Sequence, residues 1–344
     1  MSSASPVPLS VLDLSPVASG RPPASALHES VALARAVEAL GYHRHWVTEH
    51  HSSPAVVSAP AVLLAALAAA TTTLRVGAGG IMLPNHSPLH VAETFRALEA
   101  LHPGRVDLGL GRAPGTDGRT ALALRRSRQA LAADDFAEQY AELRGYVEGF
   151  APAHPFAGTT AMPTGVPLPP VWVLGSSDHG ARVAAQLGTG YAYAGHFGAL
   201  DPADPLRAYR DSFVPSGPRR APHALLSVAA LVAADAGRAD ELARAATLAT
   251  VRLRLGAPAP LPTPEEAAAH RWTLAERNVA GRLGDHLVAG TAPDVAGRLA
   301  RLALRTGADE LLVVTNVHDP AERAASYALL AQAWPGAWAA ARAA

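Results

Sequence analysis

The chain has 344 residues, of which 49% are hydrophobic, and its 29 basic side chains equal its 29 acidic ones in number. A chain of this length can bury one large core, so we expect one barrel-sized domain over residues 1–344, with insertions, rather than two small domains. The zero formal net charge predicts neither nucleic acid nor an anionic membrane as a partner, which leaves a small molecule as the expected ligand.

Two missing residue types narrow the chemistry. The sequence contains no cysteine, which excludes disulfide bonds, a thiolate nucleophile and cysteine-ligated metal sites. It also contains no lysine, which excludes a Schiff-base mechanism. Residues 1–8 lack the pattern of a signal peptide, and the alanine-rich stretch 59–70 is too short to span a bilayer, so we expect a cytoplasmic protein.

Short apolar runs alternate with segments that have helical apolar spacing. The runs predict strands at 9–14, 45–48, 74–78, 106–110, 171–174, 191–194, 225–232 and 310–314. The segments predict helices at 26–40, 60–70, 88–101, 134–150, 179–187, 202–213, 235–255 and 292–306, with a closing helix at 320–334. Eight strand and helix units in strict alternation predict an α/β fold, the parallel (β/α)8 TIM barrel, whose catalytic groups follow the strands at the C-terminal mouth.

Two segments predict insertions at the mouth of this barrel. Residues 151–170 are rich in proline and glycine, and residues 256–290 join a proline cluster to a charged, weakly apolar stretch. Long excursions above a barrel mouth are often lids. We expect 256–290 to be a mobile lid over the substrate, with a disordered surface loop as the alternative.

The second and third predicted strands end in residues that suit chemistry. Glu49, His50 and His51 follow the second strand, and we expect one of the two histidines to face the site, because neighbouring strand residues point to opposite faces. Gly79 and Gly80 follow the third strand, where bare backbone admits a flat ring. A simple turn is the commoner meaning of such a glycine pair.

The next two strand ends predict a phosphate site. Residues 175–177, Gly-Ser-Ser, come directly before the helix that begins near His179, so their hydroxyl and N–H groups suit a phosphate. An ordinary serine cap of that helix is the alternative. Arg112, after the fourth strand, predicts a guanidinium partner for the same phosphate, and the alternative for it is an ion pair with Asp107 or Asp117.

Six motifs at these strand ends are specific when they are taken together. They span residues 9–16, 46–51, 79–86, 107–117, 172–177 and 191–197. Together they resemble the luciferase-like flavin-dependent monooxygenases, the superfamily of the bacterial luciferase alpha chain. The resemblance covers nearly the whole chain and is weakest between residues 256 and 290.

This resemblance implies a barrel that binds reduced FMN at its mouth and lets it react with dioxygen at C4a. The resulting peroxyflavin would oxidise a small organic substrate, such as an aldehyde or a biosynthetic intermediate. A separate flavin reductase would supply the reduced FMN, since no dinucleotide-binding glycine motif follows a strand. Related barrels pair through the helices after their early strands, so we expect a homodimer.

The resemblance also implies roles for single residues. His50 matches the acid/base histidine near the flavin, a role that suits a near-neutral pKa. The pair Gly79 and Gly80 matches a cis peptide behind the flavin ring, although the luciferases have alanines there. The phosphate-binding positions match Arg112, Gly175, Ser176 and Ser177, with His179 near the same helix start. The residues expected to border the isoalloxazine are Ala194, Gly195 and His196.

Three other interpretations remain open. The first is a deazaflavin-dependent oxidoreductase on the same fold. The second is a non-catalytic flavin-binding subunit, because luciferase-like barrels also form heterodimers in which one chain lacks the working site. The third is a metal-dependent barrel hydrolase, in which the ligands would be Glu49, His50, His51 and either His86 or His90.

Overall fold

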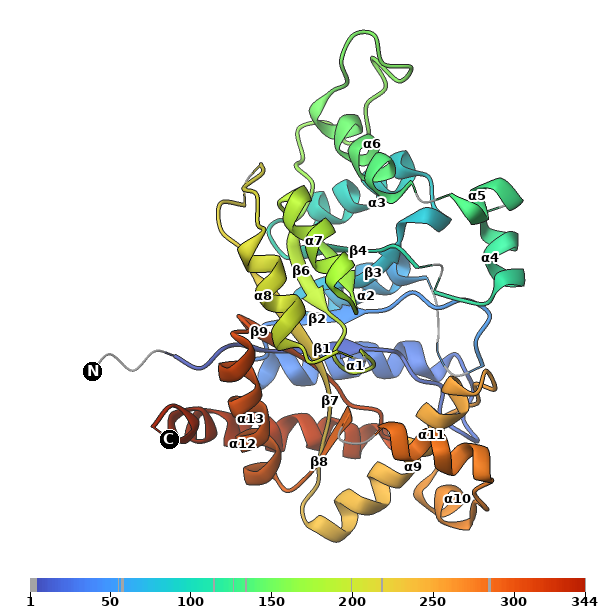
Figure 1. Ribbon diagram of the computed structural model, residues 1–344, viewed down its shortest axis with the longest axis vertical. Helices are drawn as coiled ribbons and strands as arrows, with labels where there is room; N and C mark the ends of the chain where they lie inside the picture. Colours follow the sequence, from blue (N-terminus) through green and yellow to red (C-terminus); the bar gives the residue numbers. More distant parts are fainter. Residues whose placement is uncertain are drawn as a thin grey trace.

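A computed structural model describes residues 5–343, apart from residues 55, 57, 58, 114, 126, 134, 199, 218, 284 and 285. Parallel strands form a sheet that closes on itself, and helices pack around it (Figure 1). The described strands are β1 (Leu9–Asp13), β2 (Arg44–Val47), β3 (Arg75–Met82), β4 (Val106–Gly111), β5 (Val171–Gly175), β6 (Gly190–Tyr193), β7 (Ala224–Val232), β8 (Leu287–Gly290) and β9 (Glu310–Val314).

The described α-helices follow the strands in the alternation that the sequence predicts. Those at or near predicted helices are α1 (Ser25–Ala39), α2 (Pro60–Ala70), α3 (Pro88–Leu101), α6 (Phe136–Glu148), α7 (Asp178–Leu187), α8 (Ala203–Asp211), α9 (Ala236–Arg254), α12 (Ala292–Thr306) and α13 (Pro320–Ala343). Unpredicted ones are α4 (Gly118–Arg125), α5 (Arg128–Ala132), α10 (Pro264–Ala269) and α11 (Leu274–Leu283), besides the short 3-10 helix η1 (Leu83–Asn85). The first residue of the predicted helix 134–150 lies outside the described residues.

Eight strands close the barrel, in the order β1 to β7 and then β9, which pairs back to β1. This arrangement confirms the predicted (β/α)8 fold. The largest extension beyond the predicted strands is in β3, which continues to Met82, and Gly79 and Gly80 therefore lie within it rather than after it. The unpredicted strand β8 pairs with Ala229–Val232, the second half of β7.

The two predicted insertions lie at different ends of the barrel. Residues 151–170 connect α6 to β5, and the carbonyl oxygen of Pro170 accepts a hydrogen bond from the N–H of Leu108, near the start of β4, over 3.0 Å. The prediction that this segment lies at the mouth is wrong, because a connection from a helix to the next strand returns to the N-terminal edge of a parallel sheet. In Figure 1 the segment projects beyond α6.

The second insertion does reach the mouth, and it is folded. It contains α10, α11 and β8, and Leu261 pairs with the loop after β1: its N–H donates to Val17 O over 2.8 Å, and its carbonyl accepts from Ser19 N–H over 2.9 Å. The motion of this segment stays a prediction.

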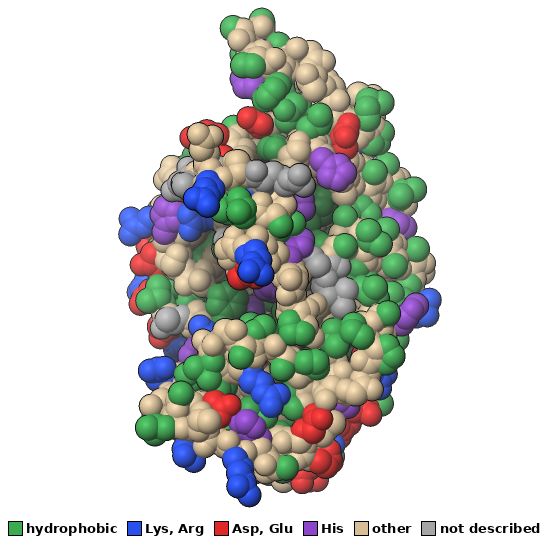
Figure 2. All heavy atoms as spheres, turned by 90° about the vertical axis from the view of Figure 1, so that its right-hand side faces the viewer, with side chains coloured by type: hydrophobic (Ala, Val, Ile, Leu, Met, Phe, Trp, Pro, Cys, Tyr) green, Lys and Arg blue, Asp and Glu red, His purple; other side chains and the backbone are tan. Residues whose placement is uncertain are grey.

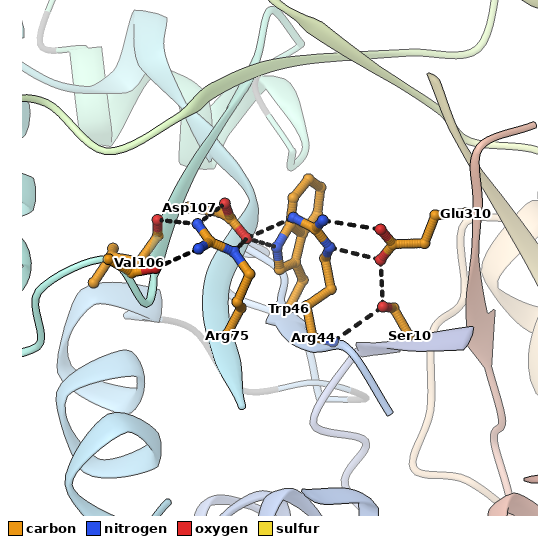
Figure 3. Close-up of polar contacts among 8 residues, drawn as sticks. Ser10, Arg44, Trp46, Arg75, Val106, Asp107 and Glu310 are labelled. Carbon is orange, nitrogen blue, oxygen red and sulfur yellow. Dashed lines mark hydrogen bonds and ion pairs between the residues drawn. The ribbon is translucent and has the colours of Figure 1, made fainter. Parts of the chain in front are cut away.

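The barrel interior is apolar at mid-height and ionic toward the N-terminal ends of the strands. The rings of Trp46 and Trp172 meet edge to face with centroids 5.7 Å apart. Below them the buried guanidinium of Arg44 lies between Asp107, at 2.7 Å, and Glu310, at 2.6 Å (Figure 3). This ionic layer fills the barrel interior at the N-terminal ends of the strands.

No helix in the described part of the chain is long and apolar enough to cross a membrane.

Candidate functional site

The C-terminal ends of the strands open into a cavity of about 590 Å³. Leu14 after β1, His50 after β2 and Asn316 after β9 line it, and these three strands are neighbours in the sheet. The second half of α9 and residues 256–261 cover it. Figure 2 shows a recess on the side of the molecule that carries α4, α10 and α11, with histidine side chains around it.

The glycine, arginine and serine motifs belong to the other half of the mouth. Gly79 and Gly80 lie in β3, Arg112 follows β4, Gly175 ends β5, and Ala194 follows β6. These four strands are also consecutive in the sheet. The cavity thus lies mainly over β9, β1 and β2, with Gly115, Thr116 and Asp117 of the loop after β4 also in its wall, and the predicted flavin motifs lie over β3 to β6.

Glu49, after β2, accepts hydrogen bonds from three residues around it. Its buried carboxylate accepts hydrogen bonds at Oε1 from His51 Nε2 (2.7 Å) and His86 Nε2 (2.8 Å), and at Oε2 from the N–H of Met82 (3.0 Å). Burial alone would raise the pKa of Glu49, but the bonds from His86, His51 and Met82 outweigh it and hold the pKa below its usual value. Glu49 thus ties the end of β2 to the end of β3 and to the turn before α3.

Both histidines of the pair face the cavity, whereas we expected only one of them to do so. The alternation of strand side chains ends with β2 at Val47, so it no longer constrains His50 and His51. His51 lines a second cavity as well, of about 420 Å³, between the starts of α2 and α3.

His50 lies close enough to a second histidine, His196, to influence its pKa. The Nδ1 of His50 lies 3.3 Å from the carbonyl oxygen of Gly115, and burial lowers the pKa of His50. His196, after β6, has Nδ1 2.6 Å from the Ser227 hydroxyl. Burial, followed by repulsion from His50 and Arg254, lowers the pKa of His196 to about 3. Both shifts favour the neutral imidazole at pH 7.

The residues of the predicted phosphate site converge at the ends of β4, β5 and β6. The N–H of Ala194 donates to Gly175 O over 2.8 Å, and the Tyr191 hydroxyl donates to Ser177 O over 3.2 Å. Burial raises the pKa of Tyr191, and the charge of Arg112 acts against that rise, which puts the guanidinium near the same phenol.

Neither the serine cap nor the ion pair with Asp107 or Asp117 is found in the described part of the chain. Ser177 is the N-cap residue of α7, but its side chain makes no capping hydrogen bond. Arg112 is half-buried and has no ion pair within the described ranges, since Asp107 binds Arg44 and Arg75 and Asp117 binds backbone N–H groups. Arg112 has no ion pair in the described ranges and lies near a helix N-terminus whose N-cap side chain makes no hydrogen bond, and both features fit an anionic group. Asp178 supplies a carboxylate in the first turn of α7.

The peptide bond between Gly79 and Gly80 is cis, as the resemblance implies. Both glycines are also needed for packing. A Cβ on Gly79 would lie 2.7 Å from Leu12 Cδ1, and one on Gly80 would lie 2.8 Å from the carbonyl oxygen of Gly109. Contact between these glycines and a flavin ring stays a prediction.

The predicted metal ligands are arranged as a hydrogen-bonded cluster. The Nε2 atoms of His51 and His86 both bond to Glu49 Oε1, so they do not point at a common position that a metal ion could occupy. Within the described residues, no group of three or more histidine and carboxylate side chains has the geometry to hold a metal ion. His179 is exposed on the first turn of α7.

A family profile described as luciferase-like monooxygenase matches residues 7–310. The chain belongs to the luciferase-like monooxygenase family. A protein of Escherichia coli (strain K12) described as a luciferase-like monooxygenase is 39% identical over 325 residues, which cover 94% of this chain and 96% of that protein. The N-acetyl-S-alkylcysteine monooxygenase of Bacillus subtilis (strain 168) is 33% identical over 335 residues, with 94% and 97% covered.

Solved structures agree with this family membership. The crystal structure of apo-MsnO8 superposes with a TM-score of 0.84 at 35% identity and covers 95% of this chain and 98% of that one. In this luciferase-like chain, sequence reasoning did not assign a role to Ser227 or Asn316. Ser227 is a polar residue inside the apolar strand β7, and Asn316 comes shortly after β9. Either position could have marked a site residue, because the sites of such barrels lie at the strand ends.

Proposed function

We propose that this chain is an FMN-dependent monooxygenase, which uses dioxygen and reduced FMN from a separate flavin reductase to oxidise a small organic substrate. The observation that supports it best is Arg112, a half-buried guanidinium without a carboxylate partner within the described ranges, near the uncapped start of α7. The phosphate of FMN would supply the missing anion, and the isoalloxazine ring of FMN would extend toward Gly79 and Gly80.

Each part of the mouth has a role in this proposal. Arg112, Ser176, Ser177 and the first N–H groups of α7 hold the phosphate, and Gly175 keeps the strand end close to the helix. When bound, reduced FMN supplies the electrons that activate dioxygen. The cavity over β9, β1 and β2 holds the substrate, and residues 256–261 keep bulk water out of it.

His50 exchanges the proton in this proposal. Its Nδ1 lies beside the Gly115 carbonyl, and a proton there donates to that oxygen. Nε2 is then the basic atom of a neutral imidazole, because burial keeps the pKa of His50 below its usual value. His196, with a pKa of about 3, stays neutral at and well below pH 7, so it places no positive charge beside the flavin ring.

Titration with two flavins tests the phosphate site. Arg112→Gln should weaken FMN binding about 10- to 100-fold, because a hydrogen-bonded charge is lost, and should change riboflavin binding less than about threefold. Arg119→Gln, at an exposed position of α4, is the matched control and should change neither. Equal losses for FMN and riboflavin would contradict the phosphate assignment. Absence of FMN binding together with binding of a deazaflavin would favour the reductase alternative.

We also propose that two copies associate through α2 and α3. Val62, on α2, is 74% exposed, and Leu101, at the end of α3, is 69% exposed, which is unusual for large apolar side chains on one pair of helices. The mass in solution tests this part, and a monomer at micromolar concentration would contradict it.

A further inference from the structure

The described wall of the 590 Å³ cavity carries a carboxylate but no arginine or lysine. None of its described lining residues is arginine, and the chain has no lysine. Asp117 is the one carboxylate among those described lining residues, and hydrogen bonds from the N–H and hydroxyl of Thr120 lower its pKa. Apart from the imidazoles of His50 and His51, of which His51 is already bonded to Glu49, the cavity therefore offers a ligand carboxylate no cationic partner, and Asp117 places a negative charge at its edge.

Asn316 supplies the cavity with an unused polar group. It follows β9 and lines the cavity, and its Oδ1 is buried without a hydrogen-bond partner in the described structure. A buried amide oxygen in this state costs free energy until a donor reaches it, either directly or after rotation of the side chain. The rest of the wall is largely apolar, with Leu14, Val56, Leu253 and Leu261 among its members.

We propose, on the basis of the monooxygenase function above, that the substrate is an uncharged, mainly apolar molecule with one amide or similar neutral hydrogen-bonding group, which Asn316 binds. An anionic substrate is excluded, because a carboxylate would lose its hydration without gaining an ion pair. The name of the Bacillus subtilis relative gives N-acetyl-S-alkylcysteine as its substrate, which is an acid. The present chain should prefer the neutral form of such a molecule.

A pair of matched probes tests this inference by calorimetry on the purified protein with saturating FMN. N-acetyl-S-butylcysteine and its methyl ester differ only in the charged group, and both carry an amide. The ester should bind at least tenfold more tightly than the acid. Asn316→Leu, which keeps the approximate side-chain volume, should weaken ester binding roughly three- to tenfold.

A gain-of-charge variant gives an independent readout. Thr250→Arg places a cation on the α9 wall of the cavity and should strengthen binding of the acid at least fivefold while leaving the ester within twofold. Thr247→Arg is the control, one turn earlier on α9 and outside the described cavity lining; it should change neither probe.

The outcomes separate this inference from the proposed function. Equal affinity for acid and ester, or an Asn316→Leu variant that binds the ester as tightly as the unchanged chain, would overturn the inference. So would failure of both this pair and a second pair, octanamide and octanoate, to bind at millimolar concentration. FMN binding measured in the same preparation reports on the monooxygenase proposal alone, so loss of the ester preference with intact FMN binding rejects only the substrate class.

Discussion

Replacement of Glu49 by glutamine tests how the second strand end is held. The carboxylate accepts from two imidazoles at one oxygen and from the N–H of Met82 at the other. An amide has only one accepting oxygen, so its NH2 group must face either Met82 N–H or both imidazoles. The less costly orientation leaves one buried N–H unsatisfied, at about 1–3 kcal/mol, and replaces two charge-assisted bonds by weaker neutral ones.

After relaxation we expect a loss of about 2–4 kcal/mol in the free energy of unfolding at pH 7. For a chain of 344 residues, 1 kcal/mol corresponds to about 1.4 °C in Tm, so Glu49→Gln should melt about 3–6 °C lower. Glu148→Gln is the control, because this glutamate is 54% exposed and its i,i+4 pair with Arg144 is worth roughly 0.3–0.5 kcal/mol.

The effect should also depend on pH in a defined direction. The pKa of Glu49 is lowered in the folded state, so its stabilisation is complete above the unfolded value of 4.5 and is lost as pH falls through the folded value. The difference in Tm between Glu49→Gln and the unchanged chain, measured by calorimetry, should therefore narrow below pH 4.5. A drop at pH 7 no larger than that of Glu148→Gln, or a gap that is the same at pH 4 and pH 7, would refute the reasoning.

Two further predictions concern the barrel floor and the mouth. Arg44→Met leaves the buried carboxylates of Asp107 and Glu310 without their shared cation and should lower stability by about 3–5 kcal/mol; denaturant unfolding checks this, and adding Glu310→Leu should recover part of the loss. His196, with a pKa of about 3, should show no imidazole titration by NMR between pH 4.5 and 8, and its burial should make folding less favourable as pH falls from 6.5 toward 3. A His196 titration near 6.5 would contradict its burial, and equal stability of Arg44→Met and the unchanged chain would contradict the ionic floor.

The barrel was predictable from the sequence because its strands are apolar and its long helices have a regular apolar period. The missed elements lack these features. β8 has four residues, and α10 and α11 are short helices in a polar stretch, whose formation depends on contacts such as the pairing of Leu261 with the loop after β1. The closing helix was predicted to end before Pro335, yet it continues, because Trp338 beyond the proline is buried against the core.

The candidate site was predictable only where position along a strand determines it. His50, Arg112 and Ser177 follow strands in sequence, so their shared end of the barrel follows from the fold. The contact between Glu49 and His86 does not follow from the fold in this way. His86 lies 37 residues away in sequence, and the two side chains meet only because two loops pack together. The unsatisfied amide oxygen of Asn316 could not be predicted either, because only the folded structure shows which buried polar atoms lack a hydrogen-bond partner.

His50 lies outside regular structure, yet several contacts restrict it, and this bears on its proposed role. The neighbouring Glu49 is bound at both carboxylate oxygens, and the imidazole faces the carbonyl of Gly115. Gly115 has φ of 65°, and a Cβ there would lie 2.9 Å from the carbonyl oxygen of Glu49, so the two loops pack backbone to backbone. A loop residue held in this way can be positioned as closely as one on a strand, which proton exchange at a defined atom requires.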